Sequence, residues 1–406
     1  MGKENKLHVI LLGRRNNGKS ALLNALTGQQ TSIVSDTPGT TTDPVRRGHE
    51  IPGLAPVTFI DTAGIDDHSP LGKKRAAATA RAIEEADIAI IVITANRFDT
   101  VEQTLARTLD ERDIPYLVVH NKRDQQPLLP ATRERLAAAR DIPVIDYSAT
   151  LDTDTTPLLD AITATARRVI PTPAPLAADL LAPGEHALLV IPVDTEAPTG
   201  RLILPQVQLA RDLLDHHCIV TLARPGELHA IPWHADHAPR LVITDSQAFA
   251  RVAAIVPPDI SLTSFSIILA RHKGPFDDYL RGTPAIDKLR DNHRVLVIEA
   301  CSHHVTRDDI ARHKLPAWIR RRAGQNVHFD FVAGRDPLPR PVTDYALVIH
   351  CGGCMATPRQ IHNRLLPATR AGVPVTNLGM AIAYLNGIFD RVTRPLVKNP
   401  NTAGGQ

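Results

Sequence analysis

The chain has 406 residues, which is too long for one typical domain, so two or three domains are expected. Hydrophobic residues make up 43% and charged residues 22%, as in ordinary globular proteins. The formal net charge of +3 argues against a nucleic-acid-binding surface. No apolar stretch approaches the ~20 residues of a membrane span, and the N-terminus lacks the apolar core of a signal peptide. These features predict a cytoplasmic protein that binds neither membrane nor nucleic acid.

Residues 1–170 alternate between strand-like and helix-like runs, which predicts a mostly parallel sheet covered by helices on both faces. The expected strands are 7–12, 57–60, 88–93, 116–120 and 144–147. The expected helices are 19–26, 73–85, 100–112, 132–140 and 158–169.

Residues 171–184 begin with alternating prolines, which favour an extended linker. Residues 185–270 then read as a smaller α/β domain without a chemical motif, and a domain of that kind often forms interfaces. We therefore expect a dimerisation domain and a homodimer. Its expected strands are 187–192, 219–222, 241–244 and 264–269, and its expected helices are 206–216 and 247–255.

Residues 271–398 read as a third α/β domain, and the Gly/Asn-rich residues 399–406 are expected to be a disordered tail. The expected strands are 295–299, 327–332, 346–350 and 373–376, and the expected helices are 310–322, 359–371 and 380–387.

Residues 13–20 read Gly-Arg-Arg-Asn-Asn-Gly-Lys-Ser and match the P-loop pattern between a strand and a helix. Gly13 and Gly18 let the backbone wrap around phosphates, and the helix N-terminus adds partial positive charge. Lys19 is expected to reach the β- and γ-phosphates, and Ser20 to hold Mg²⁺. The other P-loop residues expected to contact the nucleotide are Asn16, Asn17 and Ala21.

Asp61-Thr62-Ala63-Gly64 ends the second expected strand. A carboxylate at that position suits a Mg²⁺-linked water, so Asp61 is a candidate residue of the nucleotide-binding site. Gly64 has no Cβ, so its amide can approach a γ-phosphate. We expect Lys19 and Gly64 to act in catalysis.

Asn121-Lys122-Arg123-Asp124 ends the fourth expected strand and matches the guanine-reading pattern N-K-x-D. The Asp124 carboxylate can accept two hydrogen bonds from guanine that adenine does not offer. Ser148 and Ala149 follow the fifth strand as a further guanine-facing pair. The predicted fold class is therefore α/β: a P-loop GTPase domain with a mostly parallel sheet, followed by two smaller α/β domains.

Residues 38–43, Pro-Gly-Thr-Thr-Thr-Asp, resemble the corresponding loop of the TrmE/Era group of GTPases. The resemblance implies that Thr41 ligates Mg²⁺ and acts in catalysis, and that Asn16 binds K⁺. Ile65 stands where Ras-like proteins have a catalytic Gln. Slow GTP hydrolysis stimulated by potassium is therefore expected.

Three of the four cysteines, and two histidines, follow expected strands in the last third of the chain, where α/β sheets place ligand sites. These residues are Cys301, His303, His350, Cys351 and Cys354. Thiols and imidazoles suit either structural zinc or an iron–sulfur cluster, and their pattern alone leaves both open. Cys218 reads as a small buried hydrophobe, and His234 and His237 read as parts of a surface turn.

A TrmE-like GTPase joined to C-x-H…H-C-x-x-C resembles the HydF family of FeFe-hydrogenase maturation GTPases over essentially the whole chain. The resemblance implies a 4Fe–4S cluster on Cys301, Cys351 and Cys354, with His303 and His350 as further ligands or supporting donors. It also implies a scaffold and carrier for a transient two-iron precursor cluster. The implied partners are the radical-SAM maturases HydE and HydG and the apo FeFe-hydrogenase. Two rival hypotheses are a ribosome- or tRNA-associated GTPase with structural zinc and a redox-sensing GTPase.

Overall fold

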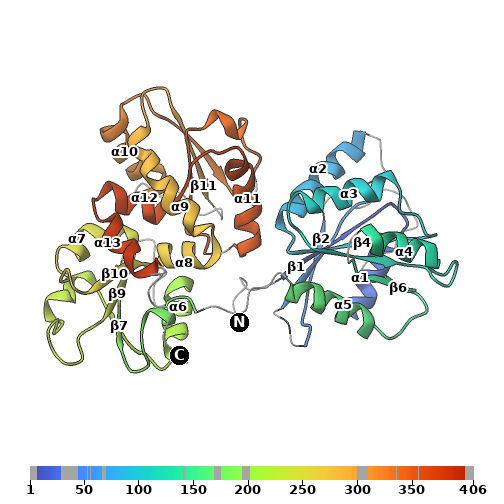
Figure 1. The fold of residues 1–406 in the computed structure, drawn as a ribbon, viewed down its shortest axis with the longest axis horizontal. Helices are drawn as coiled ribbons and strands as arrows, with labels where there is room; N and C mark the ends of the chain where they lie inside the picture. The colour runs from blue at the N-terminus through green and yellow to red at the C-terminus, as the bar shows by residue number, and fades with distance from the viewer. Residues whose placement is uncertain are drawn as a thin grey trace. The chain divides into compact units, whose positions relative to one another are not determined.

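The computed structural model describes residues 7–28, 44–52, 54, 56–65, 70–139, 142–168, 175–193, 202–299, 310–334, 336–354 and 356–397. The chain divides into two compact units, Lys3–Pro173 and Ala174–Gln406 (Figure 1).

The first unit is built on one six-stranded sheet with the order β2-β3-β1-β4-β5-β6. Its strands are β1 (Leu7–Leu12), β2 (Val45–His49), β3 (Val57–Asp61), β4 (Ile88–Ile93), β5 (Tyr116–His120) and β6 (Val144–Asp146). Every neighbouring pair is parallel except β2 and β3, which are antiparallel. The edge strand β2 was not predicted, because its sequence, VRRGH, has none of the apolar alternation by which a half-buried strand is recognised.

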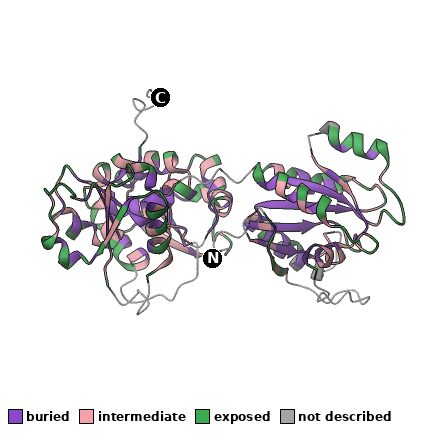
Figure 2. Ribbon diagram, turned by 90° about the horizontal axis from the view of Figure 1, so that it is seen from below, coloured by how far each residue is buried: buried purple, intermediate pink, exposed green. Residues whose placement is uncertain are grey.

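Helices cover both faces of this sheet, and strand alternation decides which residues meet which helix. The helices are α1 (Lys19–Thr27), α2 (Pro70–Glu85), α3 (Thr100–Asp110), α4 (Pro130–Ala139) and α5 (Thr156–Arg167). Val9 and Leu11 pack in one core with residues of α1 and α5. Ile10 and Leu12 face the opposite core, which contains residues of α2, α3 and α4. The central strands β1, β3, β4 and β5 are accordingly the most buried part of the unit (Figure 2).

The second unit contains two four-stranded parallel sheets, ordered β10-β9-β7-β8 and β12-β11-β13-β14. The first consists of β7 (His186–Val190), β8 (Ile219–Ala223), β9 (Leu241–Thr244) and β10 (Ser261–Ser264). The second consists of β11 (Arg294–Glu299), β12 (His328–Ala333), β13 (Leu347–His350) and β14 (Val375–Asn377). One continuous hydrophobic core contains residues of both sheets.

The α-helices of the second unit are α6 (Leu204–Asp215), α7 (Phe249–Ala253), α8 (Phe265–Lys273), α9 (Phe276–Gly282), α10 (Leu315–Ala323), α11 (Pro358–Arg370), α12 (Leu378–Leu385) and α13 (Phe389–Thr393). A π-helical turn, Ile310–Lys314, leads into α10. The short helices α9 and α13 were not predicted.

The strand predicted at 264–269 is wrong. The strand β10 ends at Ser264, and the apolar run that follows it forms the helix α8. The Ser264 hydroxyl accepts a 3.3 Å hydrogen bond from the Ile267 amide and caps that helix. The run SFSIILA is rich in aromatic and branched residues, a composition that favours a strand. The segment nevertheless forms a helix, which begins at the Ser264 cap.

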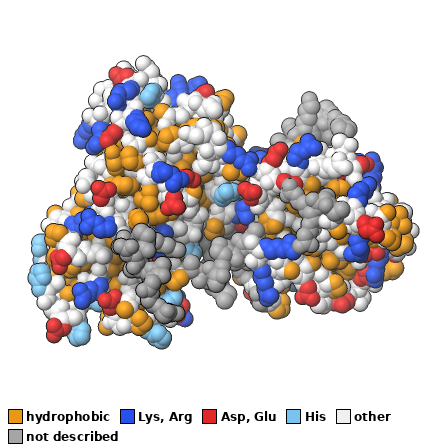
Figure 3. All heavy atoms as spheres, in the orientation of Figure 1, with side chains coloured by type: hydrophobic (Ala, Val, Ile, Leu, Met, Phe, Trp, Pro, Cys, Tyr) orange, Lys and Arg blue, Asp and Glu red, His pale blue; other side chains and the backbone are white. Residues whose placement is uncertain are grey.

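The predicted fold class is confirmed: a P-loop domain with a mostly parallel sheet is followed by two smaller parallel α/β sheets. Within the described residues, no helix is both long and apolar enough to cross a membrane. On the face drawn in Figure 3, basic and acidic side chains are interspersed over each unit.

Candidate functional site

The P-loop runs from the end of β1 to the start of α1 and is shaped by two glycines with positive φ. A Cβ on Gly13 would lie 2.4 Å from the Val92 carbonyl oxygen, so only glycine fits there. A Cβ on Gly18 would lie 2.4 Å from Asn121 Nδ2. Asn17 is buried and donates a 2.7 Å hydrogen bond from Nδ2 to the Val92 carbonyl. The loop is therefore pressed against the ends of β4 and β5.

Lys19 and Ser20 begin α1 and face the loop and the end of β3. The buried Lys19 ammonium donates to the carbonyls of Gly13, at 3.1 Å, and Arg14, at 2.8 Å. Ser20 Oγ donates to Asp61 Oδ2 at 2.5 Å. Ala21 is the next residue of α1 and is half-buried.

Asp61 is buried at the end of β3, and its second carboxylate oxygen, Oδ1, has no hydrogen-bond partner among the described residues. Burial raises the pKa of Asp61 above its usual range, while the Ser20 hydrogen bond and the charge of Lys19 act in the opposite direction. A buried carboxylate oxygen without a partner, beside a hydroxyl, has the oxygen chemistry that a hydrated divalent cation needs.

Gly64 lies against the P-loop, because a Cβ at this position would be 2.6 Å from the Arg15 amide nitrogen. Ile65 is partly buried and packs against the core beneath α2, α3 and α4. Thr41 lies outside the described residues. Asn16 is exposed and has a φ of 64°, a left-handed conformation that asparagine tolerates better than most residues.

The three guanine-side segments are joined by the side chain of Asn121. Its Nδ2 donates to the Asn17 carbonyl at 2.9 Å, and its Oδ1 accepts from the Ala149 amide at 3.0 Å. Ser148 Oγ donates to Asp124 Oδ1 at 2.5 Å. Lys122, which follows Asn121 in the N-K-x-D segment, has a φ of 61°. The structure therefore brings the N-K-x-D segment, the Ser148–Ala149 pair and the P-loop into one connected network.

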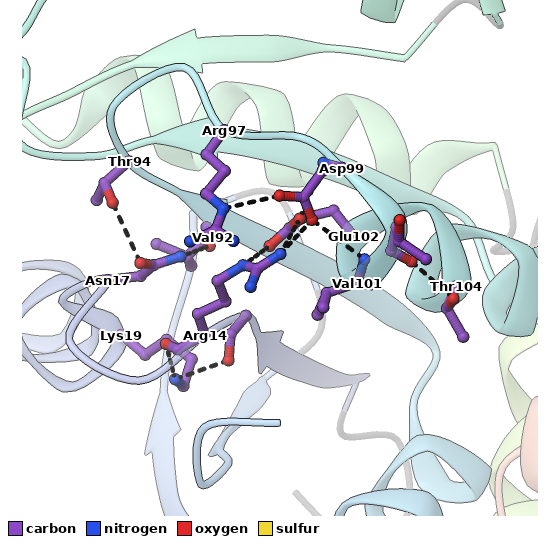
Figure 4. A network of polar contacts seen from close by, with 12 residues as sticks. Arg14, Asn17, Lys19, Val92, Thr94, Arg97, Asp99, Val101, Glu102 and Thr104 are labelled. Carbon is purple, nitrogen blue, oxygen red and sulfur yellow. Dashed lines mark hydrogen bonds and ion pairs between the residues drawn. The ribbon is translucent and has the colours of Figure 1, made fainter. Parts of the chain in front are cut away.

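A second network, absent from the sequence-based prediction, ties the P-loop to α3 (Figure 4). The Arg14 guanidinium donates to both carboxylate oxygens of Glu102, at 2.8 and 3.2 Å, and also pairs with Asp99. The Glu102 side chain is fully buried. Asp99 and Glu102 also form the capping box at the start of α3. The D-x-x-E spacing is a visible signal of a helix start, but it does not reveal the pairing with Arg14.

Two of the five predicted cluster-site residues, Cys351 and Cys354, lie on the turn that follows β13 in the second unit, and a third, His350, is the last residue of that strand. The Gly353 amide donates to Cys351 Sγ at 3.4 Å. Gly353 has a φ of 62°, and a Cβ there would lie 2.6 Å from Ile361 Cδ1, so the turn depends on glycine. Cys351 and Cys354 are both partly buried. Cys301 and His303 lie outside the described residues. Among the residues that are described, no three His, Cys, Asp or Glu side chains gather into a metal-binding group.

His350 is buried at the end of β13, and burial lowers the pKa of His350 to about 4. Its Nδ1 lies 2.7 Å from the Cys351 carbonyl oxygen, which only accepts hydrogen bonds. The neutral ring therefore carries its proton on Nδ1 and its lone pair on Nε2.

Cys218 is 5% exposed, and burial raises the pKa of its thiol. His234 and His237 are exposed in the segment before β9.

Three families match consecutive parts of the chain. Residues 8–122 match the family of 50S ribosome-binding GTPases. Residues 176–274 match the hydrogen maturase F dimerization domain, and residues 277–395 match the hydrogen maturase F tetramerization domain. The last two matches together cover more than half of the chain.

Relatives resemble the first unit. The tRNA modification GTPase MnmE of Nitrosomonas europaea is 40% identical over 129 residues, which are 32% of this chain and 28% of the relative. GTPase Der of Kosmotoga olearia is 37% identical over 162 residues, 38% of this chain and 36% of the relative. The chain thus spans about a third of the length of these two relatives. A crystal structure of Era with MgGDPNP and a 16S ribosomal RNA segment has 21% identity and a TM-score of 0.36, covering 54% of this chain and 92% of that one.

Proposed function

The chain belongs to the hydrogen maturase F (HydF) family, and on that premise we propose that it is a GTP-hydrolysing scaffold for the two-iron precursor of the FeFe-hydrogenase active site. The observation that carries the proposal is the order of the parts: a GTPase domain is followed directly by both HydF domains.

The nucleotide role is supported by the connected network of the first unit. Lys19 would neutralise phosphate charge, and the amides of the P-loop and Gly64 would face phosphate oxygens. Ser20 and Thr41 would ligate Mg²⁺, with Asp61 accepting from a metal-bound water through its unpartnered Oδ1. The nucleotide contacts would come from Gly13, Asn16, Asn17, Gly18, Lys19, Ser20, Ala21, Asn121, Lys122, Asp124, Ser148 and Ala149.

A slow rate of hydrolysis follows from the residue after Gly64. Ile65 has no group that can orient an attacking water, and its side chain packs into the core. Water positioning must therefore come from another group. K⁺ held by Asn16 would act separately, by adding positive charge near the phosphates.

The cluster role is supported by the chemistry of the donors on the turn after β13. Two thiols with a glycine pair between them suit a soft metal centre, and an amide already donates to the Cys351 sulfur. Cys301 would supply the third thiolate, and the Nε2 lone pair of neutral His350, or His303, a further donor. When bound, a 4Fe–4S cluster would supply an iron site to which the two-iron precursor attaches.

The partners follow from the same proposal. The matched dimerization and tetramerization domains indicate an oligomer. The precursor would come from the radical-SAM maturases HydE and HydG and pass to apo FeFe-hydrogenase in the cytoplasm.

Anaerobic purification and reconstitution with iron and sulfide test the cluster. We expect broad visible absorption and iron in the wild type and in Cys218→Ala, and neither in Cys351→Ser. GTP hydrolysis should stay near the wild-type rate in both variants, because the cysteine turn and the P-loop belong to different units. Zinc without visible absorption would instead favour a GTPase with a structural zinc site. Loss of GTP hydrolysis together with the cluster in Cys351→Ser would refute separate sites.

A further inference from the structure

The helix α8 contacts both halves of the second unit. It contacts α6 and β10, which lie within the dimerization-domain match, and α11, α12 and β14, which lie within the tetramerization-domain match. The helix lies within the dimerization-domain match, whereas the cysteine turn lies within the tetramerization-domain match. Any contact from α8 to the turn therefore passes from one matched domain to the other.

Two side chains of α8 reach the cysteine turn. Ser266 and Lys273 are separated by about two helical turns, so they lie on the same side of the helix. Ser266 is close enough to Gly352 that a Cβ added there would be 3.3 Å from its hydroxyl. Lys273 Nζ donates to the carbonyl oxygens of Gly353, at 3.3 Å, and Cys354, at 3.1 Å.

Lys273 is notable because it is a cation placed inside the protein. The residue is 9% exposed, and lysine is rarely buried unless its ammonium is paired. At the end of a helix, a lysine can also complement the helix dipole. This ammonium donates two hydrogen bonds to the cysteine turn.

The turn is also held by Asn377, which caps α12. Its Nδ2 donates to the Cys351 carbonyl at 3.3 Å, and its Oδ1 accepts from Ser266 Oγ at 3.1 Å and from the Gly379 amide at 2.8 Å. The carbonyls of Cys351, Gly353 and Cys354 are thus all held by side chains from outside the turn.

We propose that Lys273 is a positioning residue for the Cys351–Cys354 turn: its two hydrogen bonds fix the shape of the turn, and its charge stabilises negative charge on a centre bound by the thiolates. This proposal rests on the proposed cluster only for its electrostatic part. In a medium of low dielectric constant, a cation this close to the ligand backbone favours thiolate and the reduced, more negative state of an iron–sulfur centre.

The positional part is tested in the metal-free protein by hydrogen–deuterium exchange of the peptide that spans 351–357. Lys273→Met, which removes the charge and both donors, should speed exchange there, because the turn loses two anchors. Lys273→Arg should stay near the wild type. Lys288→Met, at an exposed lysine of the same unit, is the matched control. Circular dichroism verifies folding, and Lys273→Gln replaces Lys273→Met if that variant does not fold.

The electrostatic part is tested after reconstitution by a redox titration and by iron release to a chelator. Lys273→Met should shift the midpoint potential to more negative values and weaken iron retention by about 10-fold or more, as loss of a supporting group typically does. Lys273→Arg should restore both values. Exchange and potential that match Lys288→Met would overturn the proposal. If the wild type itself takes up no iron, the proposed cluster is refuted. The exchange experiment still tests whether Lys273 fixes the shape of the turn.

Discussion

The Ser20 hydroxyl donates a 2.5 Å hydrogen bond to Asp61, which directly joins the first turn of α1 to the end of β3. Ser20 is the proposed Mg²⁺ ligand, and Asp61 the acceptor for a metal-bound water. Asp61→Asn should therefore weaken Mg²⁺ in the nucleotide complex by about 10- to 100-fold. Titrating GTP hydrolysis against MgCl₂ measures this. An unchanged Mg²⁺ requirement would remove Asp61 from the metal site.

The same carboxylate predicts a pH dependence of the metal-free protein. Burial raises the folded pKa of Asp61 above the usual 3.8. The folded state therefore holds this proton more tightly than the unfolded state. The resulting stability is present below pH 3.8 and is lost as the pH rises through the folded pKa. Without Mg²⁺ and nucleotide, Asp61→Asn should melt at a higher temperature than the wild type at pH 7.5, and the difference should shrink toward pH 4. A difference that grows in acid would contradict this sign.

The ion pair between Arg14 and the fully buried Glu102 should contribute to the stability of the first unit. Arg14→Met leaves the Glu102 carboxylate buried without its guanidinium, so the unit should lose about 3 kcal/mol. Arg97→Met is the control, because Arg97 is exposed and its partner Asp99 is also open to solvent, so the transition should stay close to that of the wild type.

The two tryptophans allow the unfolding of the two units to be followed separately in this experiment. Trp233 and Trp318 both belong to the second unit, so tryptophan fluorescence follows that unit, whereas circular dichroism follows both. Arg14→Met should move part of the dichroism transition to lower denaturant and leave the fluorescence transition in place. If both transitions move together, the two units do not unfold independently.

The sheets could be predicted well from sequence because buried parallel strands are short apolar runs between helical periods. β2 could not, since its residues are polar and it is a strand only because β3 offers a free edge. The 264–269 segment has the composition of a strand, and one local hydrogen bond from Ile267 to Ser264 accompanies its helical form.

Some parts of the candidate sites could be predicted from the sequence, and others could not. The nucleotide segments are contiguous motifs, so they could be identified residue by residue. The Arg14–Glu102 pair and the contact of Lys273 with the cysteine turn join residues far apart in the chain. Neither leaves a pattern in one sequence, because an arginine, a glutamate or a lysine at those positions is equally compatible with an exposed surface.

Asp124 predicts the choice of base. Replacing it with Asn removes one acceptor for the guanine N–H groups and introduces a donor, so GTP should bind about 100-fold more weakly or worse. The new amide can donate to the oxygen that xanthine carries in place of the guanine amine, so XTP should become the better ligand. Competition binding of GTP and XTP measures the exchange, with Gln125→Ala at the exposed neighbouring position as control. Unchanged preference for GTP would mean that the base is read elsewhere.

Asn16 predicts the response to monovalent cations. Its φ of 64° would strain most replacements, so Asn16→Gly is the cleanest change: glycine keeps the loop conformation and removes only the amide side chain. In the wild type, KCl should give faster GTP hydrolysis than NaCl at equal ionic strength, because K⁺ at this amide would add positive charge where negative charge develops on the phosphates. In Asn16→Gly, the rates in the two salts should become equal. Equal rates in the wild type would refute the potassium site, and a persisting potassium effect in Asn16→Gly would show that other oxygens hold the ion.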